Sequence, residues 1–399
     1  MHTTSPTPMR ILILAPTPFF ADRGCHMHIA EQAFALQRQG HAVHIVTYHL
    51  GRDLAGLTMT RSFPIPWYKK LGPGPSWHKF YVDPLLLITA WRVAKNFKPD
   101  VIHAHLHEGA VLGWILKKIL GLPMVFDMQG SLTGELIAHR FPLVKTAWLR
   151  SIWYALERVI DHLAEAVLVQ STEMHDELLH QFKVPASKIF MAYDGVSTQV
   201  FTPGQRDGEL MKKLAIPPGK KIIVYLGGLS PHKGVDILLE AFPQVLREVP
   251  HAFLLLMGYP NEEAYRRTAA AMGLMAHVRV TGRVLYEDAP RYLRLGDIAV
   301  APKRSQTEAN GKIYNYMAAG LPTIAFDTIM NREILGDLGI YVQDLTNPDN
   351  LARAMVKLLQ EDNMRHQLAE SVRAKAVRDY SWDAVATRIT RAYDRVIGH

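Results

Sequence analysis

An acid, a glycine turn and a helix follow one another in the stretch TEANGKIYNYMAAGLPTIAF, which starts at Thr307. The carboxylate of Glu308 could accept hydrogen bonds from sugar hydroxyl groups. Backbone N–H groups around Asn310 and Gly311 precede the helix and could bind phosphate oxygens, because a helix N-terminus carries partial positive charge. Asn315, one turn into the helix, could bind a ribose. The alternative is a solvated loop that caps the helix.

A lysine follows an apolar strand and two glycines in LGGLSPHKGVDILLEAF, residues 226–242. Lys233 lies just before an apolar helix, where its ammonium group could neutralise a diphosphate. The spacing is not that of a P-loop, which needs Gly-Lys-Ser/Thr, so we do not expect a P-loop NTPase. An exposed loop lysine is the alternative.

Arg23 and Gly24 precede the first predicted helix. A glycine there lets the backbone approach a ligand, and the helix N-terminus would present free N–H groups to a phosphate. Glycine is also common in turns for geometric reasons alone, so both interpretations stay open.

Three histidines alternate along one segment: His103, His105 and His107, followed by Glu108. Such a set could bind zinc. Side chains alternate between the faces of a strand, however, so the three cannot converge unless the strand ends among them. We therefore expect no metal site, and we keep His105 and His107 as candidates for contact with an acceptor substrate.

The elements that must position these residues alternate between strand and helix. RILILAP, HIAEQAFALQRQG and HAVHIVTY form a βαβ pattern, which indicates a parallel sheet. Residues 196–219 are polar and loosely patterned, as in a linker, and the alternation restarts at Lys220. The tail, 348–397, is helical. Two Rossmann-like domains are expected, with ligands at the carboxyl ends of the strands, in a cleft between the domains.

The composition is that of a soluble protein with two cores. The chain has 399 residues, 48% hydrophobic and 21% charged. Its single cysteine, Cys25, cannot form an internal disulfide, which fits a reducing compartment. No stretch reads as a signal peptide or a membrane span. We expect a cytoplasmic protein.

Two segments could meet a charged or apolar surface. Residues 61–98 hold seven Lys/Arg against one acid, Asp83, together with aromatic residues that include Trp67, Tyr68, Trp77, Phe80, Tyr81 and Trp91. Without a nucleic-acid motif we expect no nucleic-acid partner; anionic lipids, an anionic substrate or plain solvent remain. The helix expected at 143–163 carries an apolar stripe, which fits either a buried core or a membrane surface.

The chain resembles the family-four retaining glycosyltransferases. LGGLSPHKGVDILLEAF is similar to their GRLSPEKGVDLLIEAF, and NGKIYNYMAAGLPTIAF to their GLVLLEAMAAGLPVIAF. RGCHMHIAEQAFALQRQGHAVHIVT, DVIHAHLHEGAVLG, YDGVSTQVFTP and YSWDAV extend the match over nearly the whole chain. The resemblance implies an α/β protein of the GT-B class, with two Rossmann-like domains facing a central cleft and C-terminal helices packing back toward the N-terminal domain. We place the domains at 1–200 and 201–375, with a crossing helix at 376–399.

The resemblance also implies roles for single residues. Gly24 falls on the glycine that approaches the donor phosphates, and Lys233 on the lysine that binds the diphosphate. Glu308, or its neighbour Thr307, falls on the acid that contacts the donor sugar. Asn315 stands where the family has a second glutamate, which binds the ribose.

The sequence departs from the family pattern at the diphosphate and at the sugar. Gly228 replaces an arginine of the family, and Arg23, Arg304 or Lys312 could supply the missing charge. Gln129 replaces a histidine that contacts the sugar; glutamine can hydrogen-bond a hydroxyl but cannot shuttle a proton. Retention in this family is thought to use the donor phosphate as the base, so transfer does not require that histidine.

A retaining hexosyltransferase is the leading interpretation. It would move a sugar from a UDP- or GDP-linked donor to an acceptor hydroxyl, without a cofactor or metal. The acceptor could be a lipid carrier or a glycan, and a lipid would bring peripheral contact with the inner face of a membrane. Other GT-B enzymes, such as an epimerase or a sugar phosphate synthase, and a non-catalytic nucleotide-sugar-binding scaffold are the alternatives.

Overall fold

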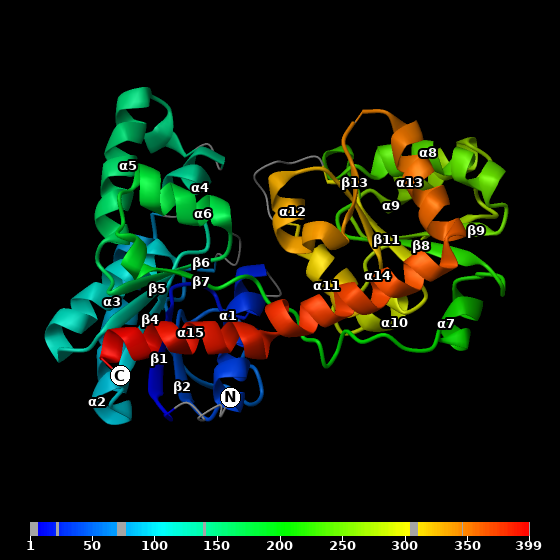
Figure 1. Ribbon diagram of the computed structural model, residues 1–399. Coiled ribbons are helices and arrows are strands. Elements are labelled where there is room, and N and C mark those ends of the chain that lie inside the picture. Colours follow the sequence, from blue (N-terminus) through cyan, green and yellow to red (C-terminus); the bar gives the residue numbers. More distant parts are fainter. Residues whose placement is uncertain are drawn as a thin grey trace. The chain divides into compact units, whose positions relative to one another are not determined.

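The computed structural model describes residues 7–20, 24–69, 77–138, 141–303, 310–344 and 346–398. The chain forms two compact units (Figure 1). Unit 1 comprises Met1–Gly195 with Trp382–His399, and unit 2 comprises Val196–Ser381. The sequence-based boundaries lay after residues 200 and 375. The chain therefore changes unit a few residues away from each expected point.

Unit 1 contains a seven-stranded sheet in which all described pairs are parallel. The strand order is β3-β2-β1-β4-β5-β6-β7, a doubly wound order that reverses between β1 and β4. The strands are β1 Arg10–Ala15, β2 Ala42–Thr47, β3 Thr58–Arg61, β4 Val101–His105, β5 Met124–Asp127, β6 Ala166–Val169 and β7 Ile189–Met191.

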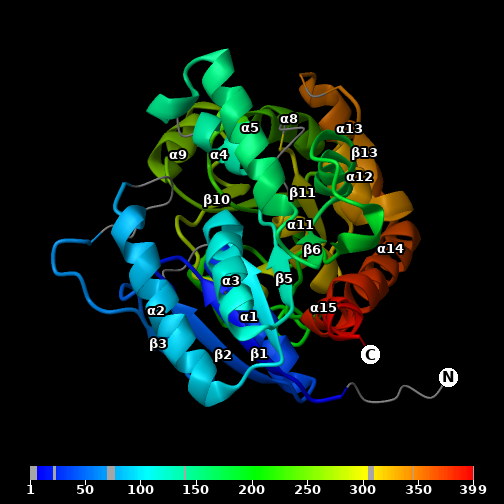
Figure 2. The same cartoon turned by 90° about the vertical axis from the view of Figure 1, so that its left-hand side faces the viewer.

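Helices cover both faces of this sheet, because neighbouring strand residues point to opposite sides. Leu12 and Leu14 of β1 pack in one core with α2 and α3 (Figure 2), whereas Ile11 and Ile13 pack in another with α1 and α15. The helices are α1 Gly24–Arg38, α2 Lys79–Phe97, α3 Leu106–Leu120, α4 Leu132–Ala138, α5 Ala147–Asp161, α6 Thr172–Asp176 and α15 Trp382–Ile397.

The last helix, α15, packs back onto unit 1, as the GT-B expectation required. The Arg38 guanidinium donates to the carboxylate of Asp383 at 2.8 Å. Tyr393 lies in the same buried core as α1, and its hydroxyl is 2.5 Å from Nδ1 of His103 on β4. The C-terminal helix thereby completes the core of the first unit.

Unit 2 repeats the architecture with a six-stranded parallel sheet in the order β10-β9-β8-β11-β12-β13, which reverses between β8 and β11. Its strands are β8 Lys221–Leu226, β9 Ala252–Met257, β10 Val278–Val280, β11 Ile298–Ala301, β12 Thr323–Phe326 and β13 Ile340–Val342. Its helices are α7 Gly208–Lys213, α8 Val235–Glu248, α9 Glu262–Ala271, α10 Ala289–Leu293, α11 Lys312–Ala318, α12 Ile329–Leu335, α13 Pro348–Gln360 and α14 Asp362–Lys375.

The helix expected at 143–163 is α5, shorter at both ends, after a 3-10 turn at Pro142–Val144. Among the helices in the described ranges, none has the length and apolar character needed to cross a bilayer.

Candidate functional site

The carboxyl end of β8, at the point where the unit 2 strand order reverses, is shaped by two buried tyrosines. The hydroxyl of Tyr225 donates to the carbonyl of Gly228 at 2.7 Å. Tyr316 on α11 accepts a hydrogen bond from the backbone N–H of Leu226, also at 2.7 Å. These bonds hold the first turns of α11 against the glycine loop that follows β8.

Lys233 is the last residue of a 3-10 turn, Pro231–Lys233, in the same loop. The next residue, Gly234, has φ +76°, and a Cβ there would lie 1.8 Å from the carbonyl oxygen of Pro302. Only glycine fits this approach. The loop of residues 227–234, which we call the lysine loop, therefore packs directly against the residues that follow β11.

Lys312 brings a second cation to these glycines. Its ammonium nitrogen lies 4.1 Å from the centre of the Tyr225 ring, a cation–π contact. A Cβ on Gly227 would come within 2.8 Å of the same nitrogen. A Cβ on Gly228 would lie 3.9 Å from Cγ of Lys233. We call Gly228, Lys233 and Lys312 the lysine cluster.

The other predicted donor residues of unit 2 differ in their surroundings. Asn310 is buried, and its amide donates to Oδ1 of Asn331 at 3.2 Å, so this side chain fixes the loop to α12. Gly311 is exposed at the start of α11, and Asn315 is half-buried in its first turns. Glu308, Thr307 and Arg304 lie outside the described residues.

In unit 1, Gly24 is the first residue of α1, after β1. A Cβ on Gly24 would meet nothing within 4 Å, so the backbone is open on that side. Arg23 lies outside the described residues. The structure is thus compatible with a close approach to Gly24 by a ligand.

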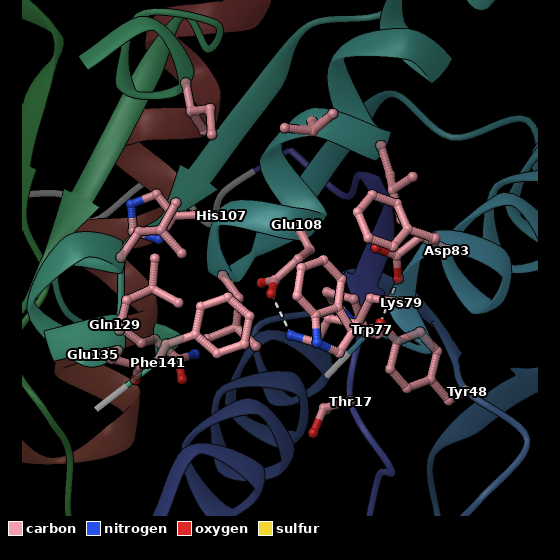
Figure 3. A pocket seen from close by; sticks show the side chains of 18 of the residues that line it. Thr17, Tyr48, Trp77, Lys79, Asp83, His107, Glu108, Gln129, Glu135 and Phe141 are labelled. Carbon is pink, nitrogen blue, oxygen red and sulfur yellow. Dashed lines mark hydrogen bonds and ion pairs between the residues drawn. The ribbon is translucent and has the colours of Figure 1, made fainter. Parts of the chain in front are cut away.

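A pocket of about 630 Å³ lies within unit 1 (Figure 3). We call it the unit 1 pocket. Its polar side chains include Tyr48, Lys79, Asp83, Glu108 and Gln129. Its walls are mostly apolar: Trp77, Phe80, Phe141, Leu143, Trp153, Leu156 and Ile160. A small polar group within a large apolar lining is typical of a site that binds an amphipathic molecule.

Two pairs of polar side chains lie in this pocket. Lys79 forms an ion pair with Glu108, and the Tyr48 hydroxyl donates to Asp83 (Figure 3). Burial favours the neutral form of Lys79, but Glu108 outweighs it and raises the lysine's pKa. Burial raises the pKa of Asp83 to about 6, although the Tyr48 hydrogen bond opposes the shift. Near neutral pH the pocket therefore contains one compensated ion pair and a carboxyl group that is easily protonated.

Gln129 lines the pocket, whereas His105 lies behind it. The Gln129 amide nitrogen is 2.9 Å from Nδ1 of His105, which has no exposed surface. Burial, and then the neighbouring His103, lowers the pKa of His105 well below its usual value. His105 is thus a neutral support for Gln129.

His107 lines the pocket but also joins a buried ionic group. Its Nε2 lies 3.6 Å from Glu157 and 3.5 Å from Asp161, both on α5. Burial lowers the pKa of His107, and the interaction with Asp161 more than reverses this. His107 therefore acts as the cationic partner of two buried acids.

Sequence reasoning missed a second buried group around Asp127. Its Oδ2 lies 3.1 Å from Nε2 of His28, 3.6 Å from His103 and 3.5 Å from His105. One ligand atom from each of Asp127, His103 and His105 lies within 4.8 Å of the others, close enough for a shared metal ion. His107 is not among them, so the three histidines do not form one site.

His28 balances the charge of this group. Burial would lower its pKa, but Asp127 and then Asp194 raise it to about 10. The pKa of Asp127 is well below its usual value despite burial, because His28 is beside it. A protonated histidine thus already occupies one side of the carboxylate and would compete with a metal cation. No local sequence pattern predicts the pairing of His28 with Asp127, because the two residues lie on separate elements, α1 and β5.

Both halves of the chain match glycosyltransferase families. Residues 23–200 match the family described as Glycosyltransferase Family 4, and residues 207–375 match Glycosyl transferases group 1. The chain is a family-four glycosyltransferase. The resemblance seen in the motifs is confirmed.

Relatives of the transferase span its whole length. The phosphatidyl-myo-inositol mannosyltransferase of Mycobacterium tuberculosis is 26% identical to the transferase over 404 aligned positions. This alignment covers 98% of each of the two chains. The spore coat protein SA of Bacillus subtilis is 30% identical over 253 positions, 60% of the transferase and 67% of the relative. The solved structure of Anabaena HepE in complex with UDP and glucose matches with a TM-score of 0.71 at 17% identity, over 97% of the transferase and 100% of HepE. The GT-B class predicted for the transferase is confirmed.

Proposed function

We propose that the transferase moves a sugar from a UDP- or GDP-linked donor to an acceptor hydroxyl, with retention of configuration and without a metal ion. The observation that carries the proposal is the lysine cluster, which brings Lys233 and Lys312 to the glycines at the end of β8. A departing diphosphate gains negative charge in the transition state, and fixed cations stabilise it. HepE, a relative in fold, was solved with UDP.

The remaining roles follow from the same proposal. Lys312 supplies part of the positive charge that an arginine at position 228 would provide. Glu308 orients the donor sugar, and Asn315 contacts the ribose. Gln129 hydrogen-bonds a hydroxyl of the sugar, and the proton of the acceptor hydroxyl passes to the leaving phosphate as the new glycosidic bond forms. That route needs no histidine at position 129.

We further propose a lipid-borne acceptor whose head group enters the unit 1 pocket. The mostly apolar walls around Lys79, Glu108 and Gln129 support an amphipathic ligand. A full-length relative is named as a mannosyltransferase of a phospholipid, phosphatidyl-myo-inositol. A lipid acceptor would place the reaction at the cytoplasmic face of a membrane.

Thermal shift with UDP, GDP and their sugars tests donor binding, because a ligand of the native state raises the melting temperature. Lys233→Ala should weaken nucleotide binding about 10- to 100-fold, the loss expected for a charge-assisted contact. Lys213→Ala, an exposed lysine of the same unit, is the control. Equal effects of the two substitutions would contradict the assignment.

Product analysis tests the chemistry. The anomeric proton signal of the product should match the configuration of the donor, and chelators should leave the rate unchanged. An altered donor formed without acceptor would indicate an epimerase. Binding without turnover on any lipid or glycan acceptor would indicate a scaffold.

A further inference from the structure

The helix α5 (Ala147–Asp161) buries its two acidic side chains, whereas an ordinary surface helix exposes its charged residues. The side chains of Glu157 and Asp161 have no exposed surface. The Glu157 carboxylate accepts hydrogen bonds from the backbone N–H groups of Leu132 and Thr133, at 2.7 and 2.9 Å. With His107 on the other side, these contacts fix which face of α5 points inward.

Large apolar side chains occupy the opposite face. Trp148, Ile152, Leu156 and Val159 are 64%, 53%, 43% and 60% exposed. Their spacing of four, four and three residues places them on one side of the helix. We call these four residues the apolar face of α5. Four adjacent exposed side chains of this size mark a surface that contacts something apolar.

The exposed charged side chains of α5 and of the turn before it are all positive. Residues 141–162 are all described, and the exposed charged side chains among them are Lys145, Arg150 and Arg158. The two acids of this stretch are the buried ones. An apolar face whose own helix exposes cations and no acid is complementary to anionic lipid head groups above acyl chains.

The apolar face continues into the rim of the unit 1 pocket. Leu156 belongs to both. Trp77 and Phe80, which also line the pocket, are 56% and 77% exposed and stack with ring centres 5.9 Å apart. Trp77 also lies 5.5 Å from the ring of Phe141 (Figure 3). One apolar surface thus joins the helix to the pocket mouth.

We propose that α5 docks unit 1 on an anionic lipid bilayer, with its apolar face at the acyl boundary and Arg158 and Lys145 at the phosphates. A lipid leaving that bilayer would reach the pocket across Trp77 and Phe80 without crossing water. This delivery rests on the proposed function, whereas the docking does not. A second copy of the chain would explain the apolar face but not why α5 exposes cations and buries both of its acids.

Co-sedimentation with vesicles tests the docking. The full-length transferase should bind vesicles of phosphatidylcholine with phosphatidylglycerol, and bind phosphatidylcholine alone at least tenfold more weakly. The double variant Ile152→Ser/Val159→Ser should reduce binding to the anionic vesicles about tenfold or more. Ile329→Ser is the matched control, since Ile329 is 73% exposed in unit 2. Arg158→Gln should weaken binding to anionic vesicles and leave the weak binding to phosphatidylcholine unchanged.

The outcomes separate the hypotheses. Absent vesicle binding by the wild type, or equal binding by the double variant, overturns the docking. A concentration-dependent dimer that the double variant abolishes, without vesicle binding by the wild type, identifies a second copy as the partner instead. Thermal shift with nucleotide diphosphates, run on the same proteins, should be unchanged by the α5 substitutions. Failure of the wild type to bind nucleotide diphosphates would contradict the proposed function. The result with vesicles would still hold, because the docking does not depend on that function.

Discussion

At the scale of single residues, Gly228 stands where the motif resemblance places an arginine of the family, and the proposed consequence of this difference is testable. Gly228 is not among the glycines with positive φ, and a Cβ there would meet nothing closer than 3.8 Å. Gly228→Arg should therefore fold and add a cation to the lysine cluster. We expect about tenfold tighter binding of a nucleoside diphosphate, measured by calorimetry. Gly228→Ala adds the Cβ without the charge, and a similar gain from it would contradict the electrostatic explanation.

His28 gives a residue-scale prediction for pH dependence. Its pKa is raised in the folded protein to about 10, so the native state holds this proton more tightly than the unfolded chain. The stabilisation is fully present below about pH 6.5 and is lost as the pH rises toward 10. The unfolding free energy of the wild type should fall over this window more steeply than that of His28→Gln, by on the order of 1 kcal/mol per pH unit.

The control for this experiment is a half-buried histidine without an acid beside it. Burial lowers the pKa of His44, which hydrogen-bonds to Thr60. The folded pKa of His44 lies below its usual value of 6.5, so His44 is neutral in both states over most of this window and His44→Gln should leave the alkaline slope unchanged. Parallel slopes for wild type and His28→Gln would show that the pairing of His28 with Asp127 does not make the unfolding free energy depend on pH.

At the scale of elements, the lysine loop depends on one backbone contact. Gly234→Ala would force a Cβ to within 1.8 Å of the Pro302 carbonyl in a residue with φ +76°. Chemical denaturation should show a loss of about 2–4 kcal/mol, since strain and a clash add. Gly273→Ala has φ +70° but nothing within 4 Å, and should cost only about 1 kcal/mol. Equal losses would mean that the contact between the two loops contributes nothing.

At the scale of the whole molecule, the chain ends in the unit where it began. Trp382, the first residue of α15, is buried in the unit 1 core, and a Cβ on Gly195 would lie 2.4 Å from its ring. Trp382→Ala should destabilise unit 1 by about 3–5 kcal/mol. Hydrogen exchange should accelerate in residues 7–195 and stay unchanged in 196–381. Trp148→Ala, at an exposed tryptophan, should leave both regions unaffected; faster exchange throughout would mean that the units do not unfold separately.

The sequence by itself determined the local structure and which ends of the strands carry the residues that we propose to bind ligands. Apolar runs broken by glycine and followed by amphipathic segments can form little other than parallel strands with crossover helices. The loop after β8 and the start of α11 were accordingly placed from the sequence, and the structure puts Lys233 beside Gly228 and Lys312 beside Gly227.

Only the tertiary structure decided which distant groups meet and which way a helix faces. His28 and Asp127 pair across 99 positions, and no local signal encodes that contact. Periodicity shows that α5 has an apolar side but not whether that side faces inward. The orientation follows from Glu157 and Asp161, whose charges must be satisfied by His107 and by the N–H groups that begin α4, and this leaves the apolar face of α5 exposed.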